Sequence, residues 1–137
     1  MHAPRFSSTY ENRALVAALD QLVAAPSEET LGALLAAALS GGITVDVTGS
    51  GPKELHARTI QTTDGRQVLP LFSSMKELKA TVSAAGQRGV RVNGIIVPGR
   101  EALGFINTAD FVAVQFNPRM PGGIVAREHI ERALAEH

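Results

Sequence analysis

The chain has 137 residues, of which 45 % are hydrophobic and 19 % charged, and its thirteen basic residues balance thirteen acidic ones. This length fits one ordinary domain, and the apolar fraction is large enough to build a core, which excludes a disordered chain. The balanced charge and the 4 % of aromatic residues exclude the basic footprint and stacking platforms of a nucleic-acid binder, and the absence of cysteine excludes disulfides, thiolate nucleophiles and cysteine-ligated zinc.

The sequence holds no signal for a membrane or for export. Nowhere do 18 apolar residues follow one another, and residues 1–13 contain no apolar segment of signal-peptide length. A chain without cysteine fits a reducing compartment. We therefore expect a cytoplasmic protein with no membrane partner.

Two helices come first in chain order. Residues 8–24 repeat apolar side chains at helical spacing, and either Ser8 or Asn12 is a candidate for the N-cap. Pro26 ends this helix because its ring cannot continue the hydrogen-bond ladder. Ser27 is the expected cap of a second helix, which carries the Leu- and Ala-rich run LGALLAAALS and ends at a Gly-Gly pair.

The hydrophobic period then changes from that of a helix to that of a strand. Residues 43–48 alternate apolar and polar side chains, which predicts a half-buried strand. Residues 55–61 and 66–72 read as a hairpin around the Asp64-Gly65 turn signal.

The second half of the chain continues this mixture. An amphipathic helix pattern starts at residue 75, residues 90–97 suggest a short strand or a buried extended segment, and residues 100–108 form at most a short helix. Residues 110–118 are almost continuously apolar, as expected of a central strand covered on both faces. A final helix is expected over roughly 124–135.

These elements predict one domain of the α+β class, or mixed α/β. Two N-terminal helices pack with further helices on a mixed sheet of about four or five strands. No linker, repeat or low-complexity tract interrupts the chain. Residues 1–11 are expected to form a tail and the start of the first helix, and residues 12–137 the single domain.

Two serines follow the strand that ends at Phe72. Ser74 and Glu77 have the S-x-x-E spacing of a capping box, in which the serine oxygen accepts the amide of residue 77 and the glutamate reaches back to the cap amide. Neither serine lies in a G-x-S-x-G motif, so no catalytic residue is predicted. Capping is the favoured role, and a second role in ligand binding stays open.

Metal and cofactor motifs are missing from the sequence. The four histidines are scattered, and none has a zinc-type partner four residues further on. The glycine-rich runs at 49–52 and 121–125 match neither a P-loop nor a dinucleotide-binding fingerprint. We therefore expect no metal and no cofactor.

The strand exit at Asn117-Pro118 is the second candidate for a site. Proline restricts the preceding residue to extended geometry, so Asn117 is expected to stay in register with its strand. Its amide is expected either to bond loop backbone near Ser73 or to line the crevice outside the strand ends, where ligands bind in open α/β sheets. If the two strands are parallel neighbours, five candidate ligand-binding residues converge: Phe72, Ser73, Ser74, Asn117 and Pro118.

The order of these signals resembles the SseB-type N-terminal domain family. The segments that carry the likeness run from residue 12 to about 134: NRALVAALDQLVAAP, LGALLAAALSGGITVDV, LPLFSSMKEL and VAVQFNP. Ser73 stands where threonine is common in that family. The family is mostly bacterial and has no established enzymatic reaction, so the resemblance implies a domain without an assigned activity.

Two function classes follow from these observations. The first is a cytoplasmic, non-catalytic module for protein interaction or binding, whose partner is another protein or a second copy of this chain. The second is a small-molecule, hydrolase or transferase site at the Ser73/Asn117 strand ends. An exposed apolar patch would favour the first class, and a cavity surrounded by perturbed titratable groups would favour the second.

Overall fold

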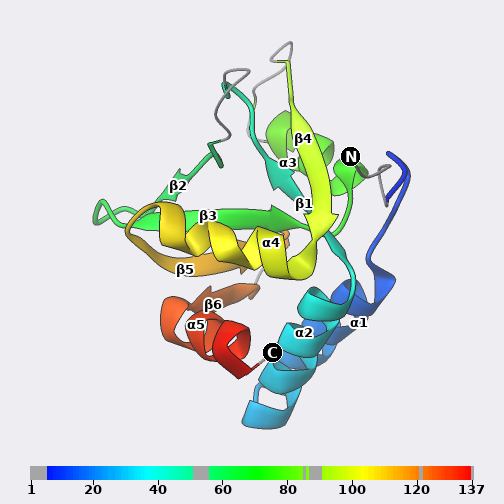
Figure 1. Cartoon of the computed structure of the whole chain (residues 1–137), viewed down its shortest axis with the longest axis vertical. Helices are drawn as coiled ribbons and strands as arrows, with labels where there is room; N and C mark the ends of the chain where they lie inside the picture. The colour runs from blue at the N-terminus through cyan, green and yellow to red at the C-terminus, as the bar shows by residue number, and fades with distance from the viewer. Residues whose placement is uncertain (1–5, 51–55, 85, 87–90, 121, 137) are drawn as a thin grey trace.

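The computed structural model describes residues 6–50, 56–84, 86, 91–120 and 122–136 (Figure 1). The first half of the chain forms α1 (Arg13–Ala24), α2 (Glu28–Ser40), β1 (Gly42–Asp46), β2 (Ile60–Gln61), β3 (Gln67–Phe72) and α3 (Met75–Ala84). The second half forms β4 (Gly94–Pro98), α4 (Gly99–Gly104), the 3-10 helix η1 (Phe105–Thr108), β5 (Phe111–Phe116), β6 (Ile124–Ala126) and α5 (Arg127–Glu136). The first residues of the predicted tail and the starts of the predicted 55–61 and 90–97 strands lie outside the described residues.

The two N-terminal helices are confirmed, with one correction at the start. Asn12 caps α1, since its side-chain oxygen accepts the Leu15 amide at 3.0 Å, and Ser27 caps α2. The expected start at residue 8 is wrong, because tertiary contacts hold the preceding segment outside the helix. The hydroxyl of Tyr10 accepts a hydrogen bond from the Gly42 amide at 2.9 Å, which ties this segment to β1.

The strands form a mixed sheet in the order β4-β1-β3-β5-β6, with β2 also paired to β3. Among the strand pairs of the described residues, β3 and β5 are parallel and the other four pairs are antiparallel. The predicted hairpin is confirmed, since Ile60 pairs with Val68, and Gly65 takes the positive φ of 86° that glycine tolerates best. The fold is therefore the predicted α+β single domain, with six strands and five α-helices among the described residues.

One strand was missed by the sequence analysis. Residues 124–126 belong to β6 and not to the last helix, which begins at Arg127. The chain reverses after β5, and the Phe116 amide donates to the Gly123 carbonyl at 2.8 Å. This bond brings the next residues back beside β5 as an antiparallel edge strand.

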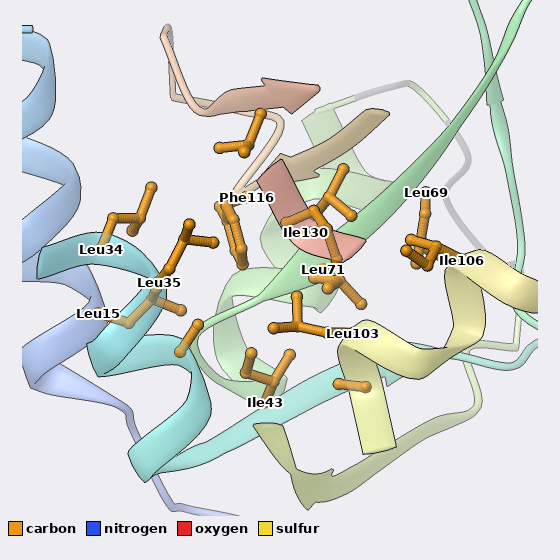
Figure 2. Packing of buried hydrophobic residues seen from close by; sticks show 14 of the residues in the cluster. Leu15, Leu34, Leu35, Ile43, Leu69, Leu71, Leu103, Ile106, Phe116 and Ile130 are labelled. Carbon is orange, nitrogen blue, oxygen red and sulfur yellow. The ribbon is translucent and has the colours of Figure 1, made fainter. Parts of the chain in front are cut away.

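Helices cover the two faces of the sheet unequally. One face packs against residues of α1, α2, α4 and α5 and contains most of the core, of which Figure 2 shows part. The other face has a smaller cluster in which Phe72 of β3 packs with Leu78 and Val82 of α3. The main core contains the ten residues labelled in Figure 2: Leu15, Leu34, Leu35, Ile43, Leu69, Leu71, Leu103, Ile106, Phe116 and Ile130.

The burial of β1 differs from the prediction, because α3 also packs against this strand. Every residue of this strand is buried, including the polar Thr44 and Asp46, so β1 is not the half-buried strand that its alternating pattern predicts. The prediction that β5 is covered on both faces is wrong at one end, where the strand is more exposed than expected. This strand lies inside the sheet, yet Val112 near its start is 40 % exposed.

Candidate functional site

The candidate site residues follow two parallel neighbouring strands. Leu71 near the end of β3 pairs with Phe116 at the end of β5, and the amide of Asn117 donates to the Leu71 carbonyl at 2.8 Å. The carboxyl ends of these strands therefore meet at one edge. Ser73 and Asn117, which are 44 positions apart in the chain, are brought together there as the sequence predicts.

Ser73 and Asn117 bond each other through both ends of the asparagine amide. The side-chain oxygen of Asn117 accepts the Ser73 amide at 2.9 Å, and its Nδ2 donates to the Ser73 hydroxyl at 3.1 Å. Both residues are buried, and Asn117 is 0 % exposed. We call this pair the Ser73–Asn117 clasp. It is the backbone-bonding role that was expected for Asn117 near Ser73.

The backbone of Asn117 departs from the expected extended geometry. Its φ is 46°, in the left-handed region that asparagine enters more readily than most residues. The Asn117 carbonyl accepts the Met120 amide at 2.8 Å, which closes a tight turn after the strand. The preference imposed by Pro118 is therefore outweighed by the hydrogen bonds on both sides of Asn117.

The clasp is also tied to the first helix. The Ser73 carbonyl accepts the Asn12 amide at 2.8 Å, and the Asn12 side chain donates to the Gly42 carbonyl at 3.1 Å while it caps α1. The cap signal of Asn12 was visible in the sequence, but its contacts with two strands were not. Together these bonds connect α1 with three neighbouring strands, so the buried polar groups at this edge serve the fold.

Ser74 is confirmed as the cap of α3, whereas its partner Glu77 acts differently from the prediction. The Ser74 hydroxyl accepts the Glu77 amide at 3.0 Å. The Glu77 carboxylate, instead of reaching back to the cap, bonds the guanidinium of Arg119 at 3.0 and 3.1 Å. The side-chain hydrogen bond with Glu77, and then its charge, raise the pKa of Arg119. Arg119 lies 42 positions away and offered no signal in the sequence.

A cleft of about 400 Å³ lies outside the clasp, between α1 and the start of α3. Ser73 and Ser74 line it, together with charged side chains on both sides. Among the described residues, the other three candidates do not line this cleft. Phe72 lies in the cluster beneath α3 and lines a separate cleft, Asn117 is buried in the clasp, and Pro118 is half-buried in the connection to β6.

A smaller, mostly apolar cleft of about 230 Å³ adjoins the first one along α1. The two clefts share Val16 and Asp20 in their linings. The apolar cleft is bordered by Val23 of α1, which is 49 % exposed, and by Met120 of the β5–β6 connection, which is 37 % exposed. We call the two clefts together the α1 groove. Sequence analysis missed it, because its sides come from three separate parts of the chain.

The charged residues of the α1 groove differ in their pairing. Arg119 is paired with Glu77, and the Arg13 guanidinium lies 3.8 Å from the Glu11 carboxylate. Asp20 and Lys76 have no ion-pair partner among the described residues. The groove therefore presents one unpaired charge of each sign to whatever binds there.

The described part of the chain lacks both a metal-binding cluster and a membrane-spanning helix. It contains no cluster of three or more His, Asp or Glu side chains placed to hold a metal ion. No helix there is long and apolar enough to cross a membrane.

Comparison with protein families gives a match over most of the chain. The SseB protein N-terminal domain matches residues 15–132, a stretch that runs from within α1 to within α5. A search of curated proteins finds no match. The match includes both residues of the clasp and the α1 groove residues from Val16 to Gly123, whereas Glu11 and Arg13 of the groove lie before it. This chain therefore belongs to the SseB protein N-terminal domain family.

Proposed function

We propose that this domain is a cytoplasmic, non-catalytic interaction module that binds a segment of a partner protein along the α1 groove. The observation that carries the proposal is the concave apolar end of the groove, where Val23 and Met120 remain exposed beside the core residue Phe116. Protein interfaces commonly have an apolar centre and a polar rim, and the charged cleft next to this end provides such a rim.

The dimensions of the groove suit a short segment. Between Arg13 and Val23, α1 advances by about 15 Å at 1.5 Å per residue. An extended segment covers that distance with four or five residues, since each adds about 3.3 Å. Such a segment would place one apolar side chain in the cleft beside Met120 and its remaining residues along the charged cleft.

The alternative function, a small-molecule, hydrolase or transferase site at the Ser73/Asn117 strand ends, stays a prediction. In its favour, Ser73 and Ser74 line a cleft of a suitable volume. Against it, both hydroxyls already accept protein hydrogen bonds, and among the described lining residues no histidine is placed to act as a general base. The hydrogen-bonded serines and the described lining without a histidine base favour the interaction module over this alternative.

The proposal is tested by selecting short random peptides on the immobilised domain and comparing three variants. Val23→Asp and Met120→Asp place a charge in the apolar cleft, whereas Ile124→Asp changes an exposed side chain outside it. We expect the selected peptides to lose about tenfold or more in affinity for the first two variants and to bind the third normally. Equal unfolding midpoints show that the variants remain folded.

Two results would contradict the proposal. One is that selection enriches no peptide, and the other is that the enriched peptides bind Val23→Asp as well as the original chain. If a second copy of this chain occupies the groove, a third and separate result is expected. Light scattering then reports twice the 14.4 kDa monomer mass, and Val23→Asp restores the monomer.

A further inference from the structure

We infer that the α1 groove selects a segment in which a basic side chain lies close to an apolar one, and that Asp20 determines this preference. The inference rests on the proposed function, because it specifies the chemistry of the segment bound at that same site. It derives from the position of Asp20 and from the pairing of the other charges around it.

Asp20 lies where the two clefts meet. It lines both of them, and on α1 it lies four residues after Val16 and three before Val23, so the three side chains share one side of the helix. Asp20 is also the only charged residue in the described lining of the apolar cleft. A side chain anchored beside Val23 and Met120 therefore has a carboxylate as its nearest charged neighbour.

Of the three basic residues that line the charged cleft, the two arginines are already paired, and only Lys76, which does not line the apolar cleft, is unpaired among the described residues. The Arg119 guanidinium is held by both oxygens of Glu77, and Arg13 is paired with Glu11. The Asp20 carboxylate has no partner among the described residues and stays exposed to solvent. The junction of the two clefts is consequently negative, and electrostatic complementarity favours a lysine or an arginine of the partner at this point.

The spacing within the partner follows from the helix geometry. Asp20 and Val23 are separated by about 4.5 Å along the α1 axis, which corresponds to one or two residues of an extended segment. The basic residue should therefore follow or precede the apolar anchor within two positions. Lys76 lines only the charged cleft, so an acidic residue of the partner would fit further from the anchor.

The test repeats the peptide selection on the original chain and on Asp20→Lys. The original chain should enrich peptides with a lysine or arginine within two positions of a large apolar residue, and Asp20→Lys should not. A peptide from the first selection should bind Asp20→Lys about tenfold more weakly, and this difference should shrink at about 1 M salt, where the Debye length is about 3 Å. Glu136→Lys on α5 changes the net charge equally but lies outside the groove, so it should bind normally.

The inference and the proposed function fail in different ways. If the enriched peptides depend on Val23 but contain no basic residue near the anchor, or bind Asp20→Lys as tightly as the original chain, the charge preference is wrong and the interaction module stands. If the inference is right, replacing the basic residue of a selected peptide by glutamine also abolishes the difference in its affinity for the original chain and for Asp20→Lys. If no peptide depends on Val23, the proposed function fails, and the inference fails with it.

Discussion

The Ser73–Asn117 clasp and the α1 groove are neighbours that use polar residues in opposite ways. In the clasp, the oxygen and the nitrogen of the Asn117 side-chain amide both bond Ser73, and both residues are buried. In the groove, Asp20 and Lys76 face a cleft without an ion-pair partner among the described residues. The carboxyl ends of parallel strands are a common ligand position, but here their polar groups join the strands. The α1 groove, which we propose as the binding surface, lies outside the clasp and along α1.

Asn117→Ala should have the largest effect, because it breaks the clasp. The substitution leaves the buried Ser73 amide without an acceptor and keeps a non-glycine residue at φ 46°. We expect a loss of about 2–4 kcal/mol in the free energy of unfolding, measured by denaturant titration. Asn117→Gly is the matched control, since it removes the same bonds but tolerates the backbone, and it should recover about 1 kcal/mol of that loss.

The opposite outcome for Asn117→Ala would reverse the comparison. If stability is unchanged while binding of a small molecule disappears, the clasp is part of a functional site. The alternative function at the strand ends would then be preferred over the interaction module.

Ser74→Ala should have a smaller effect, because it removes a cap at the edge of the charged cleft. The amide of Glu77 loses the acceptor that lies 3.0 Å away. Loss of a serine cap costs about 0.5–2 kcal/mol, so the midpoint of a denaturant melt should fall while its slope stays the same. An unchanged midpoint would leave the Ser74 hydroxyl without a structural role and would make a role in binding the better explanation.

Thr44 contrasts with the clasp residues, because its buried hydroxyl forms no hydrogen bond among the described residues. Its side chain is 0 % exposed, and its hydroxyl has no hydrogen-bond partner among the described residues. Thr44→Val keeps the shape and removes the desolvated hydroxyl, so we expect a gain of about 0.5–1 kcal/mol in the free energy of unfolding. A loss of stability would instead indicate that a buried water bonds this hydroxyl.

Local signals in the sequence predicted the fold well. The cap at Ser27, the turn at Gly65 and the existence of the strands at β1, β3 and β5 each depend on residues close in the chain, and the structure confirms them. Of the two cap candidates for the first helix, the structure selects Asn12. The convergence of Ser73 and Asn117 could also be predicted, because parallel neighbouring strands end at the same edge.

Long-range contacts explain what the sequence did not predict. The buried state of Thr44 depends on α3, which contacts β1 although it begins 31 residues after Thr44 in the chain. The left-handed backbone of Asn117 depends on bonds to Leu71 and Ser73 that outweigh the local effect of the next proline. The α1 groove exists only once α1, α3 and the β5–β6 connection are assembled, and no motif within one of these segments indicates it.

The smallest effect is expected from the ion pair between Glu77 and Arg119, which lies between the clasp and the groove. A capping box accepts glutamine as well as glutamate, so Glu77→Gln should be silent if the predicted reach-back to the cap stabilises α3. In the structure, the Glu77 carboxylate instead accepts two hydrogen bonds from Arg119. We therefore expect Glu77→Gln and Arg119→Met to cause the same loss of stability, smaller than that of Ser74→Ala, with no further loss in the double variant.

The dependence of stability on salt and pH distinguishes a role of Glu77 in the ion pair from a role in the helix cap. An exposed pair is screened, so the loss should vanish at about 1 M salt, whereas the loss in Ser74→Ala should persist. The hydrogen bond with Glu77 raises the pKa of Arg119, and a raised pKa gives stability that is complete below the ordinary value and disappears only above it. The arginine's contribution should thus be equal at neutral and mildly alkaline pH. If neither Glu77→Gln nor Arg119→Met changes the stability, the ion pair has no structural role, Glu77 is assigned to the helix cap, and Arg119 is left free to bind a partner in the groove.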